Sequence, residues 1–393
     1  MTIRVRYLGH VGQLSGYGYA AHDYMEAMRT VGIEFDVTLG SDARLDRIPS
    51  RYAWIRDYVG QKPPGWATHA IVHCVPAVAA GWRDILYSTN AEIATIPTVL
   101  MTTWETSKIP NEYVELLNSF AGIIVPSGWN RNAFLDSGVR QVDVVPHGFS
   151  SSWWHAPRPP RASQEPYRLY SIMTWSERKN PMGLLRAYWT EFRADENILL
   201  SIVTPNYSQH EVEECKRGLG LPAYAPVEFV GLAPNRLTDE ALRDLHFASD
   251  CYVTAARGEG WGLGAFEATL VGNTVIAPDY GGFKEFLPLG THSMYIRTME
   301  TPAVTPLTVS ETRIQVGDLS LRPILHNQPH GIRGDQAWAE PDLMHLRLQM
   351  RRAFTKGRQV PLSVDHNSRW TLQQHFGAEA IGKRLQSVLE AIR

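Results

Sequence analysis

Apolar stretches alternate with stretches of helical pattern along almost the whole chain, and this alternation restricts the fold more than any other feature. Short runs rich in Val, Ile and Leu, separated by segments long enough for helices, are typical of parallel sheets covered by helices. In the first part of the chain the runs occupy 3–8, 34–39, 70–74, 98–102, 122–126 and 141–145. A second series occupies 167–173, 198–203, 227–230, 251–255 and 274–277. The pattern predicts an α/β protein with two Rossmann-like halves.

A tract at 151–166 rich in tryptophan, proline and arginine separates the two series and indicates a linker. The chain has 393 residues, enough for two to three domains. We therefore predict an N-terminal domain over 1–160 and a C-terminal domain over 161–370. Residues 290–335 are irregular and rich in Pro and Thr, which indicates an insertion with one or two short strands. Helices are expected at 341–356 and 371–391, and the second should return to the N-terminal domain.

Composition limits the classes of partner and compartment. The formal net charge of −2 argues against a strongly basic protein that binds nucleic acid regardless of sequence. Three widely spaced cysteines are typical of reduced thiols in a cytoplasmic protein, and they lack the spacing of a zinc site. The N-terminus is too short and too charged for a signal peptide, and no apolar run approaches the roughly 20 residues that span a bilayer. Peripheral contact with a membrane stays open.

The segment from Gly258 to Glu267 carries the most chemistry. It lies between a predicted buried strand and a predicted helix, and such a glycine-rich turn presents free N–H groups and a helix dipole to an anion. Two carboxylates, Glu259 and Glu267, lie in this turn with seven residues between them. Because ionised carboxylates only accept hydrogen bonds, they suit a ligand that combines phosphate with sugar hydroxyls.

Three other segments follow predicted strands, where two facing Rossmann-like domains bind ligands in a cleft. The first is a glycine-rich loop over 12–18 that includes Gly16 and departs from the dinucleotide fingerprint. The second carries Trp104 and Glu105, which could stack a ring and accept a hydroxyl hydrogen bond. The third carries Arg178 and Lys179, which could hold a diphosphate and neutralise charge on a leaving group. An ordinary loop or a solvated surface is the alternative for each segment alone.

Together these residues resemble the large retaining glycosyltransferase family four, which has the GT-B fold. The resemblance rests on the two glutamates in the Gly-Glu-Gly-Trp-Gly-Leu context, and on matching segments at 279–285, 125–130, 144–148 and 16–18. It covers most of the chain apart from about 290–335. It implies two Rossmann-like domains that face each other across a cleft, with the C-terminal helix packed back on the N-terminal domain.

The resemblance also implies a role for each matching residue. Glu267 would hold the hydroxyls of the nucleotide ribose, and Glu259 would contact the hydroxyls of the donor sugar. Lys179, with Arg178, would stabilise the departing diphosphate. Many relatives carry an arginine where this chain has Thr174, so Arg178 is the candidate to replace it. The predicted donor-binding set is Glu267, Gly16, Gly260, Trp261, Gly262 and Leu263.

The acceptor side is less defined. Many relatives have a histidine near the position of Trp104 and Glu105, so these two residues are acceptor-side candidates. His147 is a third candidate, because it precedes Gly148 close to the link between the domains. Cations alternate with aromatic residues between Arg44 and Trp66, and such a segment could stack bases, contact anionic lipid or cover an ordinary surface. A hydroxylated base in DNA therefore stays open as an acceptor, beside a glycan, a lipid-linked sugar or a small molecule.

The resemblance thus implies a retaining hexosyl- or pentosyltransferase without a metal site or cofactor. Its donor would be a nucleotide-diphosphate sugar, with UDP- or GDP-sugars expected first. An epimerase or hydrolase of nucleotide sugars is one alternative on the same fold. A non-catalytic protein that binds sugar or nucleic acid is another.

Overall fold

The computed structural model describes residues 2–13, 15–39, 44–89, 91–150, 154, 165–231, 238–290, 292–302, 336–357 and 366–392. The chain forms two compact units. The first unit comprises Met1–Trp104, Lys108–Trp153 and Trp370–Arg393, and the second comprises Glu105–Ser107 and Trp154–Arg369. Most of the predicted linker at 151–166, and residues 303–335 of the predicted insertion, lie outside the described residues.

The first unit is built on a six-stranded parallel sheet in the order β2-β1-β3-β4-β5-β6. Its strands lie within two residues of the predicted bounds, because their apolar runs are buried on both faces. The strand order reverses between β1 and β3, which are direct neighbours. Such a reversal is where open α/β sheets bind ligands. The strands are β1 (Arg4–Gly9), β2 (Glu34–Leu39), β3 (His69–His73), β4 (Thr98–Met101), β5 (Gly122–Val125) and β6 (Val142–Val144).

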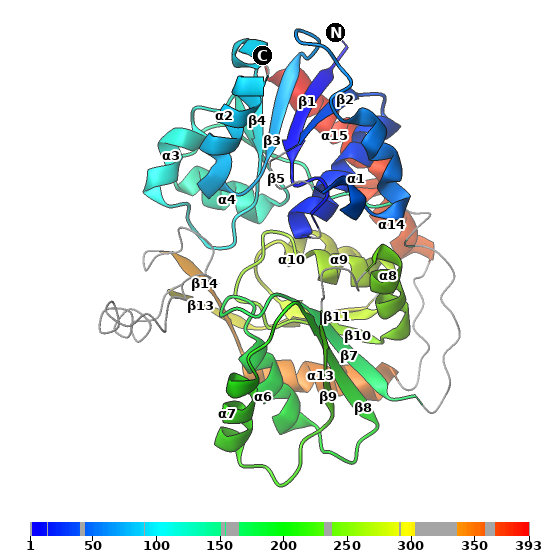
Figure 1. Ribbon diagram of the computed structural model, residues 1–393. Coiled ribbons are helices and arrows are strands. Elements are labelled where there is room, and N and C mark those ends of the chain that lie inside the picture. The colour runs from blue at the N-terminus through cyan, green and yellow to red at the C-terminus, as the bar shows by residue number, and fades with distance from the viewer. Residues whose placement is uncertain are drawn as a thin grey trace. The chain divides into compact units, whose positions relative to one another are not determined.

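Helices cover both faces of this sheet (Figure 1). On one face lie α1 (Gly16–Thr30) and α15 (Ala378–Ala391), and on the other lie α2 (Ala79–Thr89), α3 (Asn111–Leu117) and α4 (Gly128–Asp136). The C-terminal helix α15 packs on α1 as predicted, and Gly382 permits this close approach, because a Cβ there would lie 2.4 Å from the carbonyl oxygen of Ala27. Short 3₁₀ helices, η1 (Leu45–Arg47), η2 (Ser50–Tyr58), η3 (Pro76–Val78) and η4 (Ala91–Thr95), complete the unit.

Two predicted boundaries in this unit were wrong. The glycine-rich loop predicted over 12–18 ends at Ser15 and α1 begins at Gly16, because the hydroxyl of Ser15 accepts a hydrogen bond from the N–H of Gly18 at 3.2 Å and caps the helix. The helix expected over 371–391 is two helices, α14 (His366–Phe376) and α15, which are separated at Gly377. Gly377 forms a bridge with Phe149, and this pairing interrupts the helical hydrogen bonds.

The second unit contains another six-stranded parallel sheet, in the order β12-β11-β10-β7-β8-β9. The order reverses between β7 and β10, as in a dinucleotide-binding Rossmann sheet. The strands are β7 (Tyr167–Ile172), β8 (Ile198–Thr204), β9 (Val227–Gly231), β10 (Cys251–Val253), β11 (Thr274–Pro278) and β12 (Ser293–Ile296). The α/β prediction with two Rossmann-like sheets is therefore confirmed.

The segment predicted as an irregular insertion begins with ordered strands. β12 joins the main sheet beside β11, and β13 (Thr298–Pro302) pairs antiparallel with β14 (Ala337–Pro341). β14 leads directly into α13 (Leu343–Gly357). Sequence analysis expected one or two short strands in this segment, and β12 and β13 confirm that expectation for its described part.

In the second unit, α6 (Pro181–Glu191), α7 (Gln209–Leu219) and α13 cover one face of the sheet. The other face carries α8 (Asp239–Ala248), α9 (Leu263–Leu270) and α10 (Phe283–Phe286), followed by η5 (Leu287–Leu289) (Figure 1). The core beneath α6 and α13 is rich in aromatic side chains, including Tyr188, Trp189 and Phe192.

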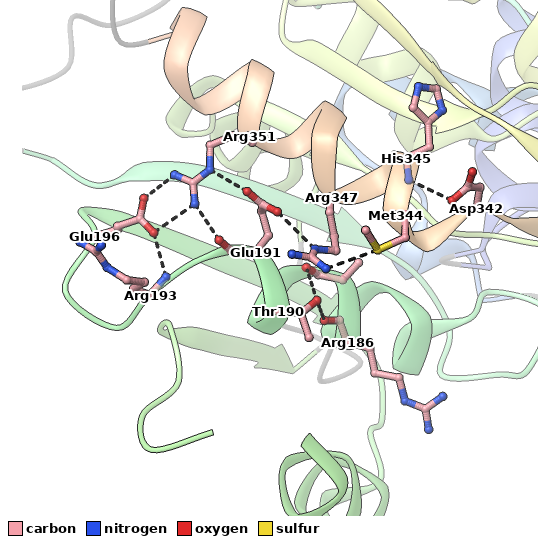
Figure 2. Close-up of polar contacts among 11 residues, drawn as sticks. Arg186, Thr190, Glu191, Arg193, Glu196, Asp342, Met344, His345, Arg347 and Arg351 are labelled. Carbon is pink, nitrogen blue, oxygen red and sulfur yellow. Dashed lines mark hydrogen bonds and ion pairs between the residues drawn. The ribbon is translucent and has the colours of Figure 1, made fainter. Parts of the chain in front are cut away.

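A network of ion pairs fastens α13 to the C-terminal end of α6 (Figure 2). Arg351 donates to the carboxylate of Glu191 at 2.8 Å, to the backbone carbonyl of Glu191 at 2.7 Å, and to the carboxylate of Glu196. Arg347 donates to the same Glu191 carboxylate at 3.2 Å. The guanidinium of Arg351 also lies 4.3 Å from the ring centroid of Phe192. This network fixes the far end of the helix whose N-terminus follows Lys179.

Candidate active site

The loops that leave β7 and β10 meet at the reversal point of the second sheet. β7 and β10 are hydrogen-bonded neighbours, so both loops leave the sheet at the same edge. The backbone N–H of Arg257 donates to the carbonyl of Arg178 at 2.7 Å, and the guanidinium of Arg178 donates to the carbonyl of Gly258 at 2.7 Å. The predicted Arg178-Lys179 and Gly258–Glu267 segments are therefore in direct contact, although 80 residues separate them.

Lys179 and Glu259 form an ion pair within this contact. Arg178 lies on the other oxygen of the same carboxylate, with Nη1 3.6 Å from Oε2. The three side chains are only 12–18% exposed. Burial alone would raise the pKa of Glu259, but Lys179 and Arg178 outweigh it and the pKa is lowered. Burial lowers the pKa of Lys179, and the attraction of Glu259 only partly offsets this.

Glu105 pairs with the guanidinium nitrogen of Arg178 that does not face Glu259. Nη2 of Arg178 is 3.6 Å from Oε1 of Glu105, whose side chain is 20% exposed. Glu105 belongs to the second unit through the short segment Glu105–Ser107, in which Ser107 exchanges hydrogen bonds with Ala337 of β14 at 2.8 and 2.9 Å. The structure thus places this acceptor-side candidate beside the predicted diphosphate-binding arginine.

The N-terminus of α9 is shaped for close approach by a ligand. Its N-cap residue, Gly262, has φ +91°, and no side chain caps the first turn. A Cβ at Gly262 would lie 2.4 Å from the ring of Phe283, so only glycine fits. By contrast, the N-terminus of α6 is closed by Asn180, whose side chain accepts from the N–H of Gly183 at 3.0 Å. The dipole available to an anion is therefore that of α9.

The other predicted donor-side residues occupy the same turn. Leu263 is the first residue of α9, and Gly260 and Trp261 precede its N-cap. The indole of Trp261 is buried and packs on Phe266 and Phe286, with ring centroids 5.3 and 5.2 Å apart. Its side chain therefore anchors the turn, and only its backbone is placed to serve a ligand.

Glu267 lies in the middle of α9 and ends a chain of buried hydrogen bonds. Its Oε2 lies 3.2 Å from Nε2 of His246, and Nδ1 of His246 lies 2.6 Å from the hydroxyl of Tyr170. The side-chain amide of Asn273 donates to that hydroxyl at 2.9 Å. Sequence analysis found Glu267 but missed the other three residues, because they come from a strand, a helix and a loop far apart in the chain.

Arg257 is a further residue that sequence analysis missed. Its guanidinium donates to both oxygens of Glu340, at 2.5 and 3.2 Å, and to the carbonyl of Glu177 at 2.5 Å. Its own carbonyl accepts from Ala339 at 2.8 Å. Arg257 therefore joins β14 to both loops of the site. The one feature of the sequence that could have pointed to Arg257 is its position immediately before Gly258.

The first unit holds the remaining candidates. Gly16 begins α1, and Trp104 is a core residue, 3% exposed, whose indole N–H donates to the carbonyl of Lys108 at 2.7 Å. The Trp104 ring is thus committed to packing, which argues against the predicted stacking role. His147 is also buried; its ring lies 5.4 Å from that of Tyr24, and burial lowers its pKa to about 3.

Two histidines, His10 and His73, lie at the reversal point of the first sheet, where β1 and β3 end. His73 ends β3 and lies 2.6 Å from the hydroxyl of Tyr7 through Nδ1. Its ring centroid is 5.2 Å from that of Tyr17, which is in turn 5.3 Å from the ring of His10. Burial, with His147 and His10 nearby, lowers the pKa of His73 well below its usual value. The His73 ring is therefore neutral at physiological pH.

The segment of alternating cations and aromatic residues mostly packs into the first unit. Tyr52 is buried and donates to the carboxylate of Asp23. Tyr58 stacks on Phe35, with ring centroids 4.7 Å apart, and Trp54 packs beside both. Tyr52 thus belongs to the core, and Trp54 and Tyr58 are partly buried against it.

Within the described residues, no group of three or more His, Cys, Asp or Glu side chains could hold a metal ion. In the same part of the chain, no helix has both the length and the apolar character needed to cross a bilayer.

Solved structures that resemble this chain over nearly its whole length include a glycosyltransferase and a protein bound to UDP-glucose. The HepE protein of Anabaena, solved in complex with UDP-glucose, is 15% identical over 99% of this chain and 100% of its own, with a TM-score of 0.60. Sucrose-phosphate synthase from Thermosynechococcus elongatus is 14% identical over 99% and 98%, with a TM-score of 0.62. A glycosyltransferase from Rickettsia africae is 13% identical over 100% and 98%, also with a TM-score of 0.62.

At these identities the similarity establishes the fold, and the predicted GT-B fold is confirmed. No protein-family model matches the chain, and no curated protein matches its sequence.

Proposed function

We propose that this protein is a retaining, metal-independent glycosyltransferase that moves a sugar from a nucleotide-diphosphate donor to a hydroxyl acceptor. The observation that carries the proposal is the cluster of Lys179, Arg178 and Glu259 at the reversal point of the second sheet, where α9 also begins without a side-chain cap. Few ligands would need two cations, an uncapped helix N-terminus and carboxylates within one turn. A sugar nucleotide needs all of them.

The diphosphate of the donor would bind Arg178 and Lys179, which form ion pairs with Glu105 and Glu259 in this structure. Phosphate and carboxylate oxygens share charge and hydrogen-bond geometry, so a diphosphate can compete with Glu105 and Glu259 for Arg178 and Lys179. Glu259, released from part of its ion pair, would then accept hydrogen bonds from the sugar hydroxyls. Glu267, farther along α9, would accept from the ribose. The acceptor site would lie in the first unit.

The transfer needs no nucleophile from the protein. The bond between the anomeric carbon and the β-phosphate oxygen breaks, and positive charge spreads over the sugar ring. Lys179 and Arg178 stabilise the negative charge that grows on the departing diphosphate. The acceptor oxygen bonds to the anomeric carbon on the face that the phosphate leaves, and its proton passes to the departing phosphate oxygen. Configuration is thereby retained, and the products are the glycoside and the nucleoside diphosphate.

Two further findings support this proposal. HepE, which has the same fold, was solved with UDP-glucose bound, so a UDP- or GDP-sugar is the first donor to test. The three cysteines Cys74, Cys215 and Cys251 are free and buried, which suits a cytoplasmic enzyme.

The test is a binding panel of UDP, GDP, ADP and their sugars, measured by thermal shift and calorimetry. A ligand at about 100 times its dissociation constant should stabilise the protein by roughly 2.7 kcal/mol. Lys179→Met and Glu259→Gln should weaken binding of the tightest ligand at least about tenfold. Lys216→Met is the matched control, since Lys216 also pairs with a glutamate, at 3.2 Å, but on the surface of α7.

Three results would contradict the proposal. The first is no binding of any nucleotide or nucleotide sugar. The second is equal binding by the Lys179→Met, Glu259→Gln and Lys216→Met variants. The third is conversion of the donor to an epimer without any acceptor, which would identify the alternative epimerase activity.

A further inference from the structure

We propose that His246 is a positioning residue that orients the Glu267 carboxylate and thereby makes the protein select ribonucleotide over 2′-deoxyribonucleotide donors. The inference rests on the proposed function, because it assigns Glu267 to the ribose. His246 itself would touch no substrate. Its effect would pass entirely through Glu267.

The donor and acceptor of each hydrogen bond that links Asn273 to Glu267 can be deduced from one backbone carbonyl. The side-chain nitrogen of Asn273 lies 2.7 Å from the carbonyl oxygen of His246, and a carbonyl can only accept, so this atom is the amide donor. The same nitrogen donates to the hydroxyl of Tyr170 at 2.9 Å. The Tyr170 proton is then free to point at Nδ1 of His246, 2.6 Å away.

This order fixes the tautomer of His246. Since Nδ1 accepts from Tyr170, the proton of the neutral ring lies on Nε2. Nε2 lies 3.2 Å from Oε2 of Glu267, so His246 donates to the carboxylate. Each member of the chain thus specifies the donor or acceptor state of the next, and the chain ends at the predicted ribose ligand.

The surroundings prevent His246 from turning. Its ring is fully buried, and Tyr170 and Trp154 contact it edge-on at centroid distances of 5.3 and 5.6 Å. Glu267 is itself 8% exposed. Within the described residues, His246 is its one side-chain hydrogen-bond partner. The other oxygen, Oε1, is therefore available to a ligand, and the carboxylate is held in one orientation before a ligand arrives.

A carboxylate fixed in this way is suited to the pair of hydroxyls on a ribose. Ribose offers two neighbouring donors, and a carboxylate that already points at them binds without losing further rotational freedom. A 2′-deoxyribose lacks one of these donors and leaves an acceptor of Glu267 unpaired. Such an unmet hydrogen bond to a charged group corresponds to at least about tenfold in affinity.

Two substitutions at His246 separate its two hydrogen bonds. In His246→Gln the amide nitrogen can occupy the place of Nε2 and still donate to Glu267. In His246→Asn the amide oxygen can occupy the place of Nδ1 and accept from Tyr170, but nothing reaches Glu267. The measurement is the ratio of dissociation constants for UDP and 2′-deoxy-UDP, and for GDP and 2′-deoxy-GDP, by calorimetry. Because one sample binds both ligands, partial unfolding does not change the ratio.

We expect the wild type to prefer the ribonucleotide by at least about tenfold, His246→Gln to keep most of this preference, and His246→Asn to lose it. Tyr170→Phe, which removes the donor to Nδ1, should reduce it partially. An unchanged ratio in His246→Asn would overturn the inference, as would an equal loss in both His246 variants. If the wild type binds none of UDP, GDP and ADP and none of their sugars, the proposed function fails instead, so the two failures are distinguishable.

Discussion

Replacement of Arg257 by methionine tests whether the site depends on the strand that joins its two loops. Methionine keeps much of the length of the side chain and removes the bonds to Glu340 and Glu177. Glu340 is 35% exposed, so solvent screening limits its ion pair to about 1 kcal/mol. The bond to the Glu177 carbonyl, which is 2.5 Å long, adds about 1.5 kcal/mol. Together they predict a loss of about 2 to 3 kcal/mol in the free energy of unfolding.

For a unit of this size, that loss should lower Tm by about 5 to 10 °C. The stronger prediction concerns turnover. Because Arg257 bonds to the segments that carry Lys179 and Glu259, their misplacement should lower kcat for consumption of the nucleotide sugar at least about tenfold at saturating donor. Urea unfolding and a nucleotide-release assay, both well below Tm, measure the two effects separately.

Arg297→Met is the matched control. Arg297 also pairs with a carboxylate of the second unit, Asp342, at 2.8 Å, but its side chain is 70% exposed and does not reach the site. We expect a change in stability below about 1 kcal/mol and no change in kcat. If Arg257→Met lowers Tm but leaves kcat unchanged, Arg257 only stabilises the fold and the argument for positioning is refuted.

Three other predictions concern single side chains. The pKa of Glu259 is lowered from about 4.5, so its ion pair with Lys179 stabilises the fold above pH 4.5. This stabilisation is lost as the pH falls through the lower pKa of the folded state. Glu259→Gln should therefore make the free energy of unfolding, measured by urea titration, depend less on pH in the acid range. His147 has its pKa lowered from 6.5 to about 3, so stability is lost as pH falls from about 6.5 toward 3, with about 2 kcal/mol lost by pH 5. His147→Asn should remove that loss, and a pH 7 to pH 5 difference equal to the wild type's would contradict it. Arg351→Met should cost about 2 to 3 kcal/mol, because Glu191 and Glu196 lose their shared partner, and calorimetry should show nucleotide affinity unchanged within about twofold.

The sequence predicted the sheets well and the helix ends less well, for a physical reason. Strands such as β2 and β8 are buried on both faces, so their apolar runs mark their bounds directly. The start of α1 depends instead on a cap from Ser15, and the break before α15 depends on a bridge to Phe149. Those events are set by single hydrogen bonds, which leave little trace in hydrophobic periodicity.

The candidate site divides in the same way. Glu259, Glu267 and Lys179 lie in short motifs, so their residue types and spacing indicated phosphate and hydroxyl chemistry. Arg257 and His246 lie in no such motif. Their roles depend on hydrogen-bond partners that come close only in the folded protein. The reach of Glu105 to Arg178 could not be predicted either, since it joins residues that lie 73 positions apart in the chain (178 − 105).

The long sequence separation of these contacts also sets an order of events during synthesis. Lys179 and Glu259 are 80 residues apart, and Arg257 and Glu340 are 83 apart, so both contacts close large loops and form after the local helices. A growing chain that has not yet released β14 from the ribosome lacks the partner that joins the two loops. Under the proposed function, the donor site is therefore complete only after β14 has been synthesised and has joined the two loops.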